Sequence, residues 1–195
     1  MHIILPEEEN PALRDVARDI PLGDISSKHI QTLIAEMKKL LSHEEYGVAL
    51  AAPQLGESIK LFIVSGRALA RDKRNAKDEP PQAARGKPDT KSSPFTPSQV
   101  EGLPDQVYIN PEFLKLSRGK KEKHEGCLSI RGKWGVVPRA EKATLRGYDE
   151  EGRAFTRGAS GFLAHVFQHE MDHLQGILYT DKATELYDDE DGAKE

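Results

Sequence analysis

The sequence predicts an α+β fold whose strands form a mostly antiparallel sheet. Two segments with apolar residues at helical spacing, 27–42 and 161–174, flank the strand segments instead of alternating with them. Turn signals such as those at 149–152 separate neighbouring strands, as expected for short antiparallel connections. A chain of 195 residues can bury one core, and we assign residues 1–184 to a single domain.

The first predicted elements are a helix, a close-packed turn and a strand. The helix at 27–42 has charged residues on its outer faces, and Ser26 or Ser27 can cap its first turn. The stretch GVALAAPQLG at 47–56 combines small residues with a proline, which suits a turn or short strand better than a helix. The run KLFIV at 60–64 then predicts a strand.

The segment at about 66–104 differs in composition from the residues around it. Charged residues at 71–77 and several prolines between 80 and 97 prevent regular structure from continuing. We therefore expect an exposed insert, either a loop or disordered. Residues 185–195 are acidic, and we expect a disordered tail there.

Further strands are predicted at 106–110, 134–137, 143–148 and 154–156. The helix at 161–174 follows them and carries the sequence HEMDH. Strands grouped together, with helices before and after them, indicate the α+β class.

Composition and charge exclude several classes of protein. The net charge of −4 argues against a strongly nucleic-acid-binding surface, because phosphate contacts need clustered lysine and arginine. No segment reaches the ~20 apolar residues that cross a bilayer, and acidic residues stand where a secretory signal would be basic. The single cysteine, Cys127, cannot form an internal disulfide. We therefore expect a cytoplasmic protein without membrane or direct nucleic-acid partners.

Two histidines on the second predicted helix are spaced to share one metal ion. His169 and His173 lie about one turn apart, and the apolar stripe that begins at Phe162 and Val166 continues onto them. Buried imidazoles need partners, and a metal ion satisfies two at this spacing. Glu170 can reach a water on the open side of that ion without ligating it, which is the division of labour in HExxH motifs.

Cys127 is the strongest candidate for a third ligand, which a catalytic metal site requires. Gly126 lets the backbone approach closely, and Leu128 offers a backbone N–H beside the thiolate. A lone cysteine is often only a small buried hydrophobe, so the assignment depends on the histidines. His165 is a rival, but ligands at 165, 169 and 173 would stretch over ~12 Å, so we interpret it as pocket wall or rim.

Three separated motifs resemble those of the peptide deformylase family. GVALAAPQ at 47–54 resembles the first motif, GxGxAAxQ; EGCLS at 125–129 matches the second; QHEMDHL at 168–174 matches the third. The resemblance implies antiparallel sheets packed around a central helix that carries the HExxH motif. It also implies a catalytic domain that removes the N-formyl group from the N-terminal methionine of newly made polypeptides and releases formate.

The resemblance assigns roles by position. Cys127, His169 and His173 would hold the metal, Glu170 would be general base and then acid, and Gln54 with the Leu128 N–H would stabilise the oxyanion. The substrate-binding residues that it implies are Gly47, Val48, Ala49, Gly126, Phe162, His165 and Val166. Core packing is the competing interpretation for the apolar Val48, Phe162 and Val166.

The same resemblance favours Fe2+ as the metal, with Zn2+, Ni2+ or Co2+ as substitutes, and one thiolate with two imidazoles suits iron or zinc. The chain departs from the family in three places. Ala49 replaces the second glycine of the first motif, the insert at 66–104 is longer than is common, and the acidic end disfavours docking on ribosomal RNA. Expected partners are therefore N-formylmethionyl nascent peptides, with no support for ribosome association.

Two other functions remain to be weighed. An HExxH metallopeptidase uses the same helix signature, but the EGCLS cysteine and the Gln54 motif argue against it. A non-catalytic relative could bind N-formylmethionyl peptides, yet it would not need the general base Glu170.

Overall fold

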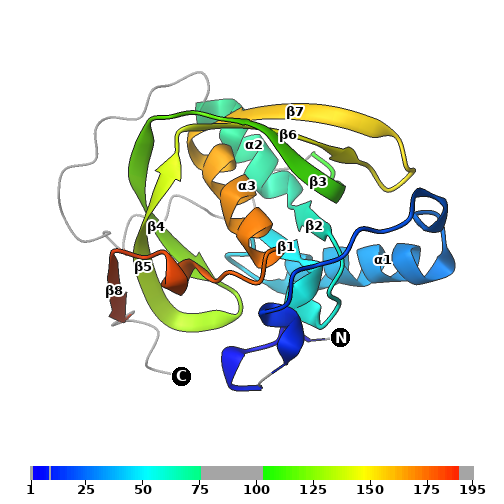
Figure 1. Ribbon diagram of the computed structural model, residues 1–195, viewed down its shortest axis with the longest axis horizontal. Coiled ribbons are helices and arrows are strands. Elements are labelled where there is room, and N and C mark those ends of the chain that lie inside the picture. Colours follow the sequence, from blue (N-terminus) through cyan, green and yellow to red (C-terminus); the bar gives the residue numbers. More distant parts are fainter. Residues whose placement is uncertain (1, 9, 76–102, 189–195) are drawn as a thin grey trace.

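Helix α3, Gly161–His173, lies between two antiparallel sheets in the computed structural model, which describes residues 2–8, 10–75 and 103–188 (Figure 1). It contacts strands of both sheets, so the helix that carries HEMDH is central, as predicted. The α+β class with antiparallel sheets is confirmed.

The strands form one five-stranded and one three-stranded sheet, and every pairing within the sheets is antiparallel. The larger sheet has the order β1, Ala49–Ala51; β2, Leu61–Val64; β3, Gln106–Leu116; β6, Lys142–Tyr148; β7, Ala154–Ser160. The smaller sheet has the order β4, Lys120–Cys127; β5, Ile130–Ala140; β8, Glu185–Asp188. β1 and β4 are therefore edge strands.

Helix α1, Lys28–His43, confirms the first predicted helix. Ser27 is its N-cap, and its side chain accepts a hydrogen bond from the backbone N of Ile30 at 3.4 Å. The buried face of α1 packs into a cluster with residues of β1, β2 and β3. A second cluster surrounds α3, where Phe62 stacks on Tyr108 with ring centroids 4.6 Å apart.

The prediction of an exposed insert at about 66–104 is wrong for its first part. Gly66–Asn75 forms helix α2, which begins where the Ser65 hydroxyl accepts a hydrogen bond from the Ala68 N at 3.3 Å. Ala68 and Leu69 are buried in the cluster around α3. The charged sequence hid this helix because so few of its residues are apolar. Residues 76–102 lie outside the described part of the chain.

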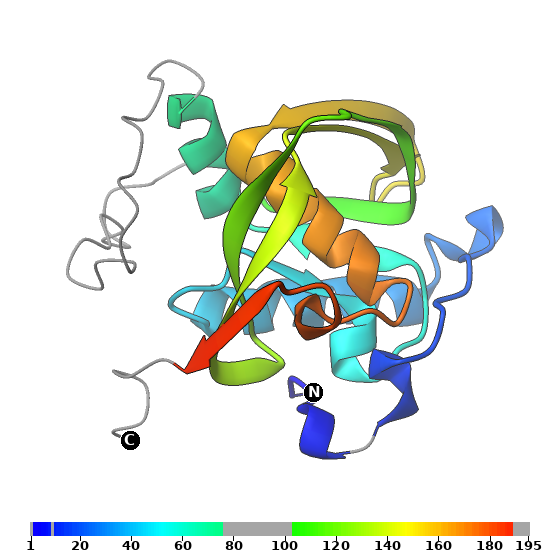
Figure 2. The same cartoon turned by 60° about the vertical axis from the view of Figure 1, so that its left-hand side comes forward.

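The predicted disordered tail is also wrong at its start. Residues Glu185–Asp188 form β8, which lies alongside β5 at the edge of the smaller sheet (Figure 2). Backbone pairing from Lys133 to Val136 supplies the hydrogen bonds that composition alone could not indicate. Residues 189–195 lie outside the described part of the chain.

Strand β4 was not predicted, because KKEKHEGC has no alternation of apolar and polar residues. Its pairing with β5 over nearly its whole length holds it in place. The other predicted strands are present, although β3 and β5 are longer than their apolar cores indicated. Within the described residues, no helix is both long enough and apolar enough to span a bilayer.

Replacing Leu69 with alanine tests whether α2 belongs to the core. Leu69 is 5% exposed, so Leu69→Ala should lower the free energy of unfolding by about 2–5 kcal/mol, measured by urea denaturation. Leu114→Ala is the control, since Leu114 is 51% exposed and its loss should change stability by no more than about 0.5 kcal/mol. Equal stability of the two variants would show that α2 is not packed.

Candidate metal centre

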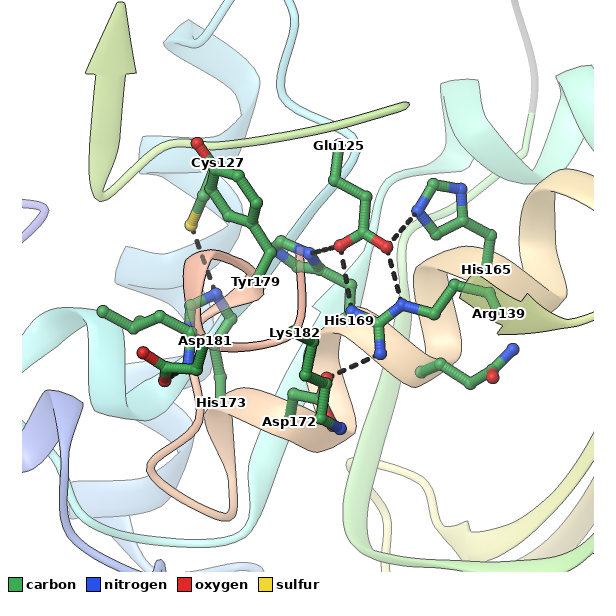
Figure 3. A network of polar contacts seen from close by, with 12 residues as sticks. Glu125, Cys127, Arg139, His165, His169, Asp172, His173, Tyr179, Asp181 and Lys182 are labelled. Carbon is green, nitrogen blue, oxygen red and sulfur yellow. Dashed lines mark hydrogen bonds and ion pairs between the residues drawn. The ribbon is translucent and has the colours of Figure 1, made fainter. Parts of the chain in front are cut away.

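The three predicted ligands meet at the end of β4 and the last turn of α3. The Cys127 Sγ lies 3.2 Å from the His173 Nε2, and the ligand atoms of Cys127, His169 and His173 all lie within 4.8 Å of one another (Figure 3). Within the described residues this is the one such group of potential ligands. Helical spacing brings the imidazoles together, and the pairing of β4 with β5 brings the cysteine to them.

The electrostatics of this group favour the forms that bind metal. Burial alone would raise the pKa of Cys127, but the neighbouring imidazoles of His173 and His169 hold it well below its ordinary value. A thiolate is the form in which cysteine ligates a metal. One thiolate and two imidazoles at this separation fit a divalent ion with a further position open.

Glu170 is a buried carboxyl beside the ligands and outside their group. It is 4% exposed, and its Oε2 has no hydrogen-bond partner among the described residues. Burial raises the pKa of Glu170 to about 7. Burying a carboxyl oxygen without a hydrogen-bond partner is costly for folding, and carboxyl groups with a strongly shifted pKa concentrate at reaction centres.

Gln54 lies in the 3-10 helix η4, Ala52–Leu55, and its amide is directed at the ligand cysteine. Its Oε1 accepts a hydrogen bond from the Ala51 N at 2.9 Å, which leaves the NH2 group 3.4 Å from the Cys127 Sγ and 3.2 Å from the Ser129 Oγ. The two predicted oxyanion donors are the Gln54 NH2 and the Leu128 backbone N–H. They belong to the same part of the site, because Leu128 directly follows Cys127.

The remaining predicted substrate residues fall into two groups. Ala49, Val166 and the partly buried Val48 and Phe162 all pack in the cluster around α3, close to the ligand helix. The two glycines are closely covered: a Cβ on Gly47 would come 2.9 Å from Leu41 and Glu44 side chains, and one on Gly126 would lie 3.4 Å from the Trp134 ring.

His165 lies outside the ligand group. Its Nε2 lies 2.8 Å from the Oε1 of Glu125, a buried acid to which the sequence analysis gave no role. Burial opposes the charge on Glu125, but hydrogen bonds from Arg139, His165 and His169 outweigh it and hold the pKa of Glu125 well below the ordinary range. Its place two residues before Cys127, at the start of EGCLS, was the available signal.

Gln168 and Asp172 each precede a ligand histidine in the sequence, and their side chains bind other parts of the chain. The Gln168 amide accepts from the Ala140 N and donates to the Ala140 O, both at 2.9 Å, and so fastens α3 to β5. Asp172 accepts from Arg139 and Lys182, both at 2.6 Å.

The site combines one thiolate from β4 with two imidazoles and a buried carboxyl from the HExxH sequence of α3. This combination defines the class of mononuclear metal-dependent hydrolases. The family model described as polypeptide deformylase matches residues 3–189. This chain belongs to the polypeptide deformylase family.

Known relatives and solved structures agree with this membership. Peptide deformylase 1A of Solanum lycopersicum, a chloroplastic protein, is 37% identical over 173 residues, which are 89% of this chain; the match spans 56% of that protein's length. The peptide deformylase of Leptospira biflexa is 34% identical over 180 residues, covering 91% of this chain and 87% of that protein. The structure of Arabidopsis thaliana peptide deformylase 1B superposes with a TM-score of 0.71 at 25% identity, covering 95% of this chain and 82% of that one.

Cobalt binding tests the ligand group directly. Because Cys127 is the sole cysteine, a thiolate-to-cobalt absorption band in the Co2+-loaded protein can arise only from this residue. We expect one Co2+ per chain with this band in the wild type, and loss of the band in Cys127→Ala. His124→Ala removes an exposed histidine of the same strand and should keep the band. A band of full intensity in Cys127→Ala would exclude the assignment.

Proposed function

We propose that this protein is a peptide deformylase that removes the N-formyl group from the N-terminal methionine of newly made polypeptides and releases formate. The observation that carries the proposal is the buried Glu170 carboxyl, whose Oε2 has no hydrogen-bond partner among the described residues, next to the ligand group of Cys127, His169 and His173. Family membership supports the substrate class. We take the described residues up to 188, which include β8, as one catalytic domain.

We propose that Cys127, His169 and His173 hold Fe2+, with Zn2+, Ni2+ or Co2+ able to replace it, since one thiolate and two imidazoles suit these ions. When bound, the ion would supply Lewis-acid chemistry toward water and the formyl oxygen. Glu170 accepts the proton of the attacking water and passes it to the nitrogen of the departing amine as the formyl C–N bond breaks. Its burial near a pKa of about 7 suits a group that must both take and give a proton.

Oxyanion stabilisation falls to the Gln54 NH2 and the Leu128 backbone N–H. The Gln54 NH2 lies at Cys127, and the hydrogen bond from the Ala51 N to the Gln54 Oε1 holds the amide with this NH2 group facing the ligand cysteine. A preoriented donor favours the transition state over the planar formyl group because the negative charge develops only on attack.

Peptide binding is proposed along the two edge strands that flank the ligand group. β1 carries Ala49 and follows Gly47 and Val48, and β4 ends with Gly126 and Cys127. Edge strands present unpaired backbone groups to which an extended peptide can add. Phe162, Val166 and His165 on α3 would line the pocket for the methionine side chain.

The alternatives have less support. A formyl-peptide-binding relative would have no use for a buried Glu170 whose Oε2 has no hydrogen-bond partner among the described residues. A metallopeptidase would have no need of the Gln54 amide beside Cys127. We propose a cytoplasmic location, and we expect no stable ribosome docking through the acidic residues at 185–195.

Replacing the proposed base gives the first functional test. Glu170→Gln should keep the metal content, because Glu170 is not a ligand, and should lower kcat for formate release from formyl-Met peptides by about 10²–10⁴-fold. Glu150→Gln, which removes the carboxylate of an ion pair with Lys38, is the control and should retain activity. Normal formate release by Glu170→Gln would refute the assigned base. A metal-loaded wild type that releases no formate would favour the binding relative.

Removing the Gln54 amide tests the oxyanion donor. Gln54→Ala should lower kcat by about 10²–10³-fold, because one preoriented donor is lost. Gln31→Ala removes an amide whose Nε2 donates to the Ile25 and Glu150 carbonyls, so it should cost stability without this loss of kcat. If the two variants lose activity only in proportion to their loss of folded protein, Gln54 is a structural residue.

A further inference from the structure

We propose that Glu125 and Arg139 are positioning residues of the metal centre that act through His169, and that Lys182 fixes the far end of the same chain of contacts. We call these residues, with Asp172, the charge relay (Figure 3). The inference deepens the proposed function and rests on it only for the role of His169 as a ligand.

The carboxylate of Glu125 has one orientation available, because all four of its acceptor positions are used. Its Oε1 accepts from the Arg139 Nε at 2.6 Å and the His165 Nε2 at 2.8 Å. Its Oε2 accepts from the Arg139 Nη2 at 2.9 Å and the His169 Nδ1 at 2.8 Å. A charged carboxylate only accepts, so the His169 Nδ1 must carry a proton, and the Nε2 is the nitrogen left for the metal.

Arg139 holds Glu125 by a geometry that only arginine provides. Its guanidinium is 4% exposed, contacts both Glu125 oxygens, and still has the Nη1 free to donate to the Asp172 Oδ2 at 2.6 Å. The other Asp172 oxygen accepts from the Lys182 Nζ at 2.6 Å. Negative and positive groups therefore alternate from Glu125 to Lys182, and the relay is neutral as a whole.

The relay joins four parts of the chain around one ligand. Glu125 comes from β4, Arg139 from β5 and Asp172 from α3, while Lys182 comes from the segment between α3 and β8. Loss of the Lys182 charge would leave Asp172 to draw the guanidinium toward itself and away from Glu125. The fixed orientation of the His169 ring then weakens, although no ligand has been changed.

Stability alone does not account for such a relay. Buried ion pairs are often no better for folding than apolar side chains of the same volume, because removing charges from water is costly. A relay that ends on a metal ligand gains a second use, since the partner of a ligating imidazole typically changes metal affinity by about 10–100-fold. If the relay only stabilises the fold, a conservative substitution lowers Tm and leaves metal binding unchanged. If the relay positions His169, the same substitution also changes the metal affinity.

Arg139→Lys distinguishes these two roles because it keeps the positive charge and loses the planar guanidinium that contacts both Glu125 oxygens. Co2+ titration of the metal-free protein should show a Kd about 10–100-fold above that of the wild type, with an altered cobalt absorption spectrum. The matched control is Arg146→Lys, since Arg146 makes a similar two-nitrogen contact with Glu112 on the exposed side of the larger sheet and should leave the Kd unchanged. A lower Tm with wild-type Kd and spectrum would overturn the proposal.

Lys182 gives a second test at a more exposed position, in case Arg139→Lys does not fold. Lys182→Met should raise the Co2+ Kd, and Lys182→Arg should restore it. Unchanged Kd in Lys182→Met would remove Lys182 from the relay. A wild type that binds Co2+ but releases no formate overturns the deformylase function and leaves the comparison of Kd values intact, whereas a wild type that binds no Co2+ overturns both.

Discussion

The buried negative charge of Glu125 is the constraint around which the centre is arranged. A carboxylate removed from water must be neutralised and fully hydrogen-bonded, and here the donors come from β5 and from two turns of α3. Satisfying it therefore fixes how the helix sits against the smaller sheet. Because Cys127 follows two residues later on the same strand, the interaction that orients His169 also fixes where the sulfur lies. The buried Glu125 carboxylate therefore determines the positions of two predicted ligands, His169 and Cys127.

Elements whose apolar residues follow a regular period could be predicted from the sequence, and the rest could not. Helix α1 has such a period, the strand β2 is a continuous apolar run, and the predicted bounds of α3 nearly match the observed ones. β4 and β8 are held by backbone pairing with β5. Such pairing forms whether the side chains are charged or apolar, so composition does not indicate it. α2 depends on two buried residues within a charged sequence. These elements owe their structure to neighbours that are distant in the chain.

The ligand group was predictable for a different reason, since spacing four apart on a helix is local information. Bringing Cys127 to the pair required the motif resemblance, because nothing near residue 127 indicates which helix it meets. Neither helical spacing nor motif resemblance indicates the ion pair of Glu125 with Arg139. In the hairpin register Glu125 is opposite Gly135, and the arginine reaches it from four residues further along β5.

The ring of Trp134, which covers Gly126, gives the protein a built-in optical probe. Trp134 is the only tryptophan in the chain, and it is 38% exposed, so its indole senses both solvent and the strand that ends in Cys127. When excitation is selective for tryptophan over the five tyrosines, the intrinsic fluorescence is thus the signal of a single indole beside the reaction centre. Emission changes can be assigned to that edge without labelling.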